Sequence, residues 1–217
     1  MQNKVQELPL LGVRCGSREN TTIALTFDDG PSYATEPVLK ILQKYQIRAT
    51  FFLIGKYVAE LPDVARLLVS YGHEIGNHTY SHPNDILLKN LLNPFPEDEV
   101  AKTQTIIKKT LGITPKVFRP TKALALHPGL KKVLMKYDLL PVTASAFLRA
   151  AWDEERQYKN ITRNLHGGDI VLLHDGYDKD HTSSLWGRKT LAILPRIIEH
   201  AGNKGLKFAT VSELLES

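Results

Sequence analysis

The chain has 217 residues, of which 42% are apolar and 24% charged, so we expect one soluble globular domain with a sizeable core. The formal net charge is +5, but the basic residues are scattered along the chain. We therefore expect an ordinary solvated surface and no nucleic-acid partner. No apolar stretch approaches the roughly 20 residues of a membrane span, which excludes a spanning helix.

The beginning of the chain carries few signals. We expect residues 1–20 to form an N-terminal segment and residues 21–217 a single domain. The first residues lack the apolar run of a signal peptide. The chain is therefore expected to be cytoplasmic as it stands, or exported with its leader already trimmed. Cys15 is the only cysteine, so an intrachain disulfide is excluded and the redox compartment cannot be inferred.

Short apolar runs alternate with amphipathic stretches along the rest of the chain. The expected strands are Ile23–Phe27, Thr50–Leu53, Glu74–Asn77, Lys116–Phe118, Leu140–Ala144, Asp169–Leu173 and Lys207–Thr210. The expected helices are Glu36–Tyr45, Asp63–Tyr71, Glu97–Thr110, Pro128–Tyr137, Glu154–Asn164 and Lys189–Ala201. This alternation predicts an α/β fold with a mostly parallel sheet. About seven strand–helix units favour a barrel or a strongly curved open sheet.

Two adjacent aspartates, Asp28 and Asp29, follow the first expected strand in the sequence TFDDG. Catalytic groups of such folds lie at the carboxyl ends of the strands, which is where this pair is expected. Adjacent ionised carboxylates repel one another, so the pair needs a positively charged partner. A metal ion would satisfy that need if one aspartate were its ligand and the other were left free to act as a base.

Two histidines, His78 and His82, follow the expected strand Glu74–Asn77. Residues four apart share a face on a turn of helix, so both rings could converge on one ion. Two histidines and one carboxylate would leave open positions for water and substrate. The spacing alone is a weak signal, and the two could be ordinary surface histidines. Their position at a strand end, like that of the aspartates, favours a metal site.

A third histidine, His174, ends the apolar run IVLLH. A lone histidine after a buried strand is more often structural than functional. At the same end of the sheet as the aspartates, however, its imidazole could deliver a proton to a leaving group.

These motifs together resemble the NodB-homology polysaccharide deacetylases of carbohydrate esterase family 4. The resemblance extends from about Thr22 to about Leu215 and includes TFDDG (26–30), HTYSH (78–82) and LLH (172–174). The stretches ATFFLIG (49–55) and GHEIGNHTYSH (72–82) are also similar to the family. The resemblance implies a distorted (β/α) barrel, in agreement with the alternation of strands and helices.

The resemblance also implies a role for each candidate site residue. Asp29, His78 and His82 would hold Zn²⁺ or another divalent transition metal such as Co²⁺ or Ni²⁺. Asp28 would be the general base, Arg119 would orient it, and His174 would be the general acid. Leu172 and Trp152 would line the acetyl pocket, and the backbone N–H of Lys122 would stabilise the oxyanion. The substrate implied is an acetylated carbohydrate polymer such as peptidoglycan or chitin oligomers, with O-acetylated xylan an alternative.

The sequence departs from the family pattern in two places. After Arg119-Pro120 the family usually has proline, an aromatic residue and glycine, whereas this chain has Thr121-Lys122-Ala123. Before Trp152 the family usually has an aspartate that tunes the catalytic histidine, whereas this chain has Ala151. The metal side of the expected site is thus intact, while the residues that support it differ.

Three functions are compatible with this pattern. The first is a metal-dependent deacetylase, a hydrolase of carbon–nitrogen bonds other than peptide bonds. The second is a catalytically weak carbohydrate-binding protein, which the altered supporting residues favour. The third is a hydrolase of small cyclic amides or imides, suggested by the replacement of the aromatic residue at Lys122. The polar loop 176–188 is either a solvated loop or a cover of the site, with Trp186 as a platform for sugar stacking.

Overall fold

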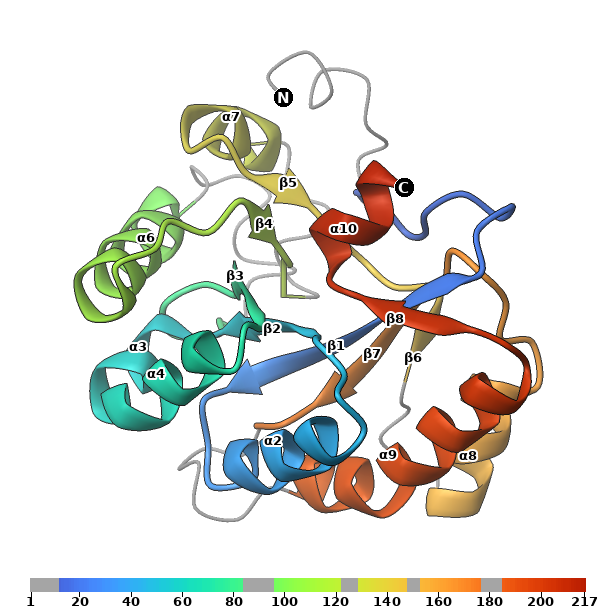
Figure 1. Cartoon of the computed structure of the whole chain (residues 1–217). Helices are drawn as coiled ribbons and strands as arrows, with labels where there is room; N and C mark the ends of the chain where they lie inside the picture. Colours follow the sequence, from blue (N-terminus) through green and yellow to red (C-terminus); the bar gives the residue numbers. More distant parts are fainter. Residues whose placement is uncertain (1–11, 84–95, 122–128, 148–152, 177–184) are drawn as a thin grey trace.

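A computed structural model describes residues 12–83, 96–121, 129–147, 153–176 and 185–217 of the chain, and the following account refers to these residues. A curled parallel sheet of eight strands forms the centre of the molecule (Figure 1). The strands are β1 (Thr22–Gly30), β2 (Thr50–Leu53), β3 (Glu74–Asn77), β4 (Val117–Phe118), β5 (Leu140–Pro141), β6 (Ala146–Phe147), β7 (Ile170–His174) and β8 (Lys207–Ala209). Their order is β5-β4-β3-β2-β1-β7-β6, and β8 pairs with β1.

Helices lie around the outside of this sheet, except α10 (Val211–Glu216), which packs against its inner face (Figure 1). The others are α2 (Thr35–Lys44), α3 (Gly55–Glu60), α4 (Pro62–Ser70), α6 (Glu97–Leu111), α7 (Leu130–Lys136), α8 (Glu154–Thr162) and α9 (Leu185–Asn203). Each longer helix has an apolar stripe at helical spacing, which it packs against the strands. In α2, for example, Val38, Leu39 and Leu42 are buried.

The two faces of the sheet bury different side chains. The outer face packs against the helices, and Phe27 and Phe51 stack there with their ring centroids 4.8 Å apart. The inner face forms a second apolar cluster in which Ala24, Phe52 and Ile170 contact Val211 of α10. Full burial of a side chain as large as Val, Ile or Phe stabilises the fold by about 1.5–3 kcal/mol. Because β1 is covered on both faces, all its residues after Thr22 are buried.

The chain almost closes the barrel where it passes from β5 to β6. β5 pairs with β4 at one edge of the sheet, and β6 pairs with β7 at the other. Residues 142–145 carry the chain across the gap between these edges. Val13 fills part of the same gap by bridging to Val142, and its carbonyl accepts a hydrogen bond from the N–H of Thr143.

The predicted distorted (β/α) barrel with about seven parallel strands is confirmed. All seven expected strands are present, although the expected strand Leu140–Ala144 is shorter because the chain there crosses to the other edge of the sheet. The strand β6 and the short helices α3 and α10 were not expected, and α9 begins at Leu185 rather than Lys189. In the described ranges, no helix is long and apolar enough to cross a membrane. The division at residue 20 stays a prediction.

Candidate active site

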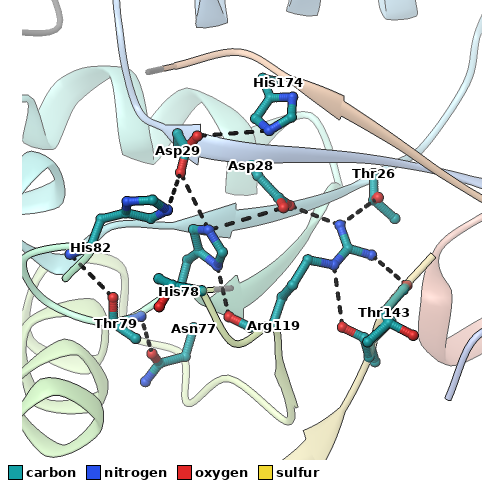
Figure 2. Close-up of polar contacts among 12 residues, drawn as sticks. Thr26, Asp28, Asp29, Asn77, His78, Thr79, His82, Arg119, Thr143 and His174 are labelled. Carbon is teal, nitrogen blue, oxygen red and sulfur yellow. Dashed lines mark hydrogen bonds and ion pairs between the residues drawn. The ribbon is translucent and has the colours of Figure 1, made fainter. Parts of the chain in front are cut away.

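The paired aspartates face one site because β1 contains a bulge. Asp28 pairs with Phe52 of β2 and Gly30 pairs with Leu53, so Asp29 is an extra residue in the ladder. Successive side chains of a regular strand point to opposite faces, which would separate the two carboxylates. Asp29 instead has a left-handed backbone with φ 72°, a conformation that aspartate tolerates better than most residues. Both carboxylates therefore reach the same group, His78 (Figure 2).

The two metal-ligand candidates from the HTYSH motif converge, but not on a helical turn as predicted. Residues 78–83 form an irregular loop in which Thr79 and His82 have left-handed backbones, with φ values of 71° and 52°. The side chain of Asn77 accepts a hydrogen bond from the N–H of Thr79, which starts the loop. The loop turns back on itself, so that the imidazoles of His78 and His82 lie with their centroids 5.1 Å apart.

Glu99 of α6 fixes the middle of this loop. Its Oε2 accepts hydrogen bonds from the N–H groups of Tyr80 and Ser81 at 3.0 and 2.8 Å, and its Oε1 accepts one from the Ser81 hydroxyl. Sequence reasoning missed Glu99, which lies 17 residues beyond His82 and has no motif of its own. An acidic residue in the first turn of α6 was the only available signal.

Asp29, His78 and His82 fit a divalent cation. The Nε2 atoms of both histidines lie 3.3 Å from Oδ1 of Asp29. Two ligands of one tetrahedral zinc ion, each bound at about 2.1 Å, lie roughly 3.4 Å apart. Oδ1 of Asp29 is buried and has no hydrogen-bond partner among the described residues. Nδ1 of His78 is 2.7 Å from the carbonyl of Arg119, so an N–H there leaves the lone pair of Nε2 facing Asp29.

The charges around this cluster shift the pKa values of all three candidate ligands. Burial opposes the charge of Asp29, but the neighbouring histidines, His78 foremost, outweigh it and hold the pKa of this carboxyl at about 2. Burial, together with His78, lowers the pKa of His82, so its imidazole is neutral and can donate a lone pair at neutral pH. Asp28 and Asp29 raise the pKa of His78 against the effect of burial, so a proton and a cation would compete for its Nε2.

Asp28 is held by a buried guanidinium. Nη1 of Arg119 donates to Oδ1 of Asp28 at 2.8 Å and to the hydroxyl of Thr26 at 2.7 Å. Nε and Nη2 of Arg119 donate to the carbonyls of Val142 and Thr143, and the guanidinium lies 4.1 Å from the ring centroid of Phe52. These contacts fix the carboxylate with its Oδ2 facing His78 at 4.0 Å (Figure 2).

His174 lies on the other side of Asp29. It is the last residue of β7 and pairs with Asp28 in the ladder between β1 and β7. Its Nε2 is 3.8 Å from Oδ2 of Asp29, while its buried Nδ1 has no hydrogen-bond partner in the described part of the chain. Burial lowers the pKa of His174, and the charges of Asp29 and Asp28 partly oppose this effect.

The remaining candidates fall into two groups. Leu172 is partly buried and lies two residues before His174 in β7, hence on the same face of the strand. Lys122, Trp152 and Ala151 lie outside the described residues, so the oxyanion donor, part of the acetyl pocket and the replaced aspartate stay predictions. Thr121 is described and buried, and its hydroxyl donates to the carbonyl of Pro83 at 3.3 Å.

Comparison with known proteins identifies relatives of the whole domain. Residues 16–142 match the polysaccharide deacetylase family model. A peptidoglycan-N-acetylglucosamine deacetylase of Bacillus cereus is 33% identical over 205 residues, covering 89% of this chain and 87% of the relative. A chitooligosaccharide deacetylase of Bradyrhizobium sp. is 30% identical, covering 95% and 98%. A bifunctional xylanase/deacetylase of Pseudobutyrivibrio xylanivorans is 33% identical over 89% of this chain, which spans only 30% of that longer relative.

The fold is also shared with solved structures. A crystal structure of a peptidoglycan N-acetylglucosamine deacetylase superposes with a TM-score of 0.81 at 27% identity, covering 94% of this chain and 92% of the other. A family 4 acetyl xylan esterase from Clostridium thermocellum, in complex with a cobalt ion, superposes with a TM-score of 0.71 at 30% identity, covering 90% of each chain. The family match, the relatives and the shared barrel agree, and the chain belongs to the polysaccharide deacetylase family.

Proposed function

We propose that this protein is a metal-dependent deacetylase that hydrolyses N-acetyl groups of a carbohydrate polymer such as peptidoglycan or chitin oligomers. The observation that carries the proposal is the convergence of Asp29, His78 and His82 around a carboxylate oxygen that has no hydrogen-bond partner among the residues described, next to a second carboxylate held by Arg119. Relatives named as deacetylases of peptidoglycan and of chitooligosaccharides support the substrate class.

Asp29, His78 and His82 would hold the cation, which we propose to be Zn²⁺ or another divalent transition metal such as Co²⁺ or Ni²⁺. One imidazole-rich, carboxylate-containing site suits all three ions, and the acetyl xylan esterase structure contains cobalt. A divalent ion bound there would polarise the acetyl carbonyl and lower the pKa of a water beside it. The three ligands leave room in the coordination shell for water and substrate.

Asp28 would act as the general base. Arg119 holds one of its oxygens, so the other is free to take a proton from the attacking water. The water oxygen then forms a bond to the carbonyl carbon, and the carbonyl oxygen becomes an oxyanion. The backbone N–H of Lys122 is the proposed donor to this oxyanion. Leu172 and Trp152 are the proposed walls of the pocket for the acetyl methyl group.

His174 would act as the general acid. As the carbon–nitrogen bond breaks, its electron pair goes to nitrogen, and the imidazolium of His174 supplies the proton that nitrogen needs to leave as an amine. The products are acetate and the free amino sugar. His174 lies across Asp29 from the other two histidines (Figure 2), with its Nε2 3.8 Å from Oδ2 of Asp29.

Hydrolysis of O-acetyl groups is the second candidate function. The similarity to an acetyl xylan esterase at 30% identity and to a xylanase/deacetylase favours it. The same base and the same cation site would serve an ester as well as an amide. The two candidates differ in the atom that leaves, which is oxygen in the ester and nitrogen in the amide.

The test is a release assay for acetate with chitin oligomers, peptidoglycan and acetylated xylan, together with a hydrolysis assay on cyclic imides, each with added Zn²⁺, Co²⁺ or Ni²⁺. We expect metal-dependent release from an N-acetylated substrate, and its loss in His78→Ala. Release from xylan alone would establish the esterase instead. Sugar binding without acetate release would identify a catalytically weak binding protein, and turnover of cyclic imides alone a small-amide hydrolase. Either of these last results would overturn the proposed function.

A further inference from the structure

Trp186 lies against the ring of His174. The centroids of the indole and the imidazole are 4.7 Å apart and the ring planes are inclined by 33°, so the two rings are in tilted contact. Trp186 is partly buried in the first turn of α9 and packs against the main apolar cluster as well. The tryptophan is thus anchored on one side by the core and contacts His174 on the other.

The same helix also holds the backbone of His174. The hydroxyl of Thr190 accepts a hydrogen bond from the N–H of His174 at 3.2 Å. Trp186 and Thr190 are four residues apart in α9, which places them on one face of the helix. One turn of α9 therefore contacts both the backbone and the imidazole of His174.

The imidazole of His174 has weak polar restraints. Its Nδ1 is buried without a hydrogen-bond partner among the described residues, and its Nε2 is 3.8 Å from Oδ2 of Asp29, beyond a hydrogen bond. A histidine ring is usually oriented by a hydrogen bond to the nitrogen that does not react. Among the described residues, the tilted indole of Trp186 is the ring contact that restricts rotation of the imidazole about its χ2 torsion, which is otherwise broad.

We propose that Trp186 is a positioning residue that aims Nε2 of His174 at the leaving group. This inference rests on the proposed function, in which His174 gives a proton to the departing nitrogen. A general acid must lie within hydrogen-bond reach of the atom that it protonates. A misplacement of about 1 Å can reduce the rate by about 100-fold, so the orientation of the ring matters for the chemical step.

The nature of the leaving group separates this role from a merely structural one. An amide nitrogen leaves only when it is protonated, so N-acetyl hydrolysis needs the aimed acid. The phenolate of 4-nitrophenyl acetate leaves as an anion and needs no proton from His174. Both reactions use the same attacking water and the same base, Asp28. Loss of the indole should therefore harm the amide reaction selectively.

The experiment compares kcat and KM of the metal-loaded parent with those of Trp186→Leu and Trp186→Phe, on a chitin oligomer and on 4-nitrophenyl acetate. We expect Trp186→Leu to lower kcat for the oligomer by about 10–100-fold and to leave ester turnover nearly unchanged. Trp186→Phe keeps an aromatic ring and should retain most amide activity. Tyr71→Leu, an exposed aromatic residue at the end of α4, is the matched control and should change neither reaction. If Trp186→Leu fails to fold, Trp186→Met fills the volume without a ring.

A double-mutant cycle completes the test. In a His174→Ala background the acid is gone, so Trp186→Leu should lower amide kcat no further. An equal loss on both substrates, or an undiminished loss in the His174→Ala background, would overturn the inference. If Trp186→Leu raises the KM for the oligomer and leaves kcat unchanged, the inference is overturned, and Trp186 is instead a platform on which the sugar stacks. A parent chain without activity on either substrate would instead refute the proposed function.

Discussion

Replacement of either adjacent aspartate of β1 by asparagine should impair a different property of the protein: catalysis in one variant and metal binding in the other. Asp28→Asn and Asp29→Asn each remove one negative charge and keep the shape of the side chain. Asp28 forms an ion pair with the guanidinium of Arg119, whose Nη1 lies 2.8 Å from Oδ1 of Asp28. The ion-pair partners of Asp29 in the described part of the chain are imidazoles, two of whose Nε2 atoms lie 3.3 Å from its Oδ1. We therefore expect Asp28→Asn to remove the base and Asp29→Asn to remove a metal ligand.

The magnitudes follow from these contacts. The amide oxygen introduced by Asp28→Asn can still accept from Nη1 of Arg119, so only the charged part of a buried hydrogen bond is lost, about 1–3 kcal/mol of unfolding free energy. A domain with about 5–15 kcal/mol of stability stays folded. Loss of a general base lowers kcat by about 10²–10⁴-fold. Removing a hydrogen-bond partner of a metal ligand lowers metal affinity by about 10–100-fold. Asp28→Asn removes only a neighbouring charge and should lower the affinity for Zn²⁺ by less than this. Asp29→Asn removes a proposed ligand itself and should lower it by more.

The assay measures two quantities on each variant: the dissociation constant for Zn²⁺ by competition with a chromogenic chelator, and acetate release from a chitin oligomer at saturating metal. The expected result is an Asp28→Asn protein that binds Zn²⁺ and turns over slowly, and an Asp29→Asn protein that binds Zn²⁺ poorly. Thermal unfolding without metal checks that both are folded. If Asp28→Asn loses the metal while Asp29→Asn retains it, the two assignments are exchanged and the charge argument fails.

Three further predictions concern the surroundings of the site. Arg119→Met should reduce the unfolding free energy by about 3–5 kcal/mol, measured by urea titration, because it leaves Asp28 buried without its cation. Burial lowers the pKa of His73 to about 4, so the unfolding free energy should fall by up to about 3 kcal/mol as the pH drops from about 6.5 to 4. His73→Asn, which can still accept from the N–H of Ala49, should flatten that slope, and an unchanged slope would refute the cause. Ala151→Asp should raise kcat and shift the basic limb of the pH profile of acetate release upward, because a carboxylate beside His174 would raise the pKa of its imidazole, and an unchanged limb in the folded, metal-loaded variant would contradict this.

The sequence predicts the elements that carry the site because their signals are local. Short apolar runs bounded by turns predict β1, β2, β3 and β7, and parallel strands place their carboxyl ends at one edge. The candidates that follow these strands therefore had to approach one another, and Asp28, Asp29, His78 and His174 do. No knowledge of side-chain contacts was needed for that step.

What the sequence could not predict depends on backbone detail and on distant contacts. The helical spacing of His78 and His82 suggested a helix, but two left-handed residues bring the rings together instead. The bulge at Asp29 has no signature beyond the adjacent aspartates and glycine. Glu99, which holds the loop, and Thr26 and Thr143, which help to hold Arg119, act across long sequence separations, where periodicity carries no information.

The charge balance of the site explains why the two aspartates need different partners. Arg119 is a permanent positive partner for Asp28, unlike a metal ion, which can dissociate. The carboxylate of Asp28 is therefore stabilised in the buried site whether or not a cation is bound. In the described ranges Asp29 has no guanidinium or ammonium partner, and in the proposed function its histidines serve as neutral ligands. Counting only Asp28, Asp29 and Arg119, the cluster carries one negative charge, and a divalent cation converts this to one positive charge. A site with that charge favours a developing oxyanion and opposes a second negative charge on the protein. The bulge that turns Asp29 toward the histidines therefore also separates the carboxylate that we propose for proton transfer from the one that we propose for the metal.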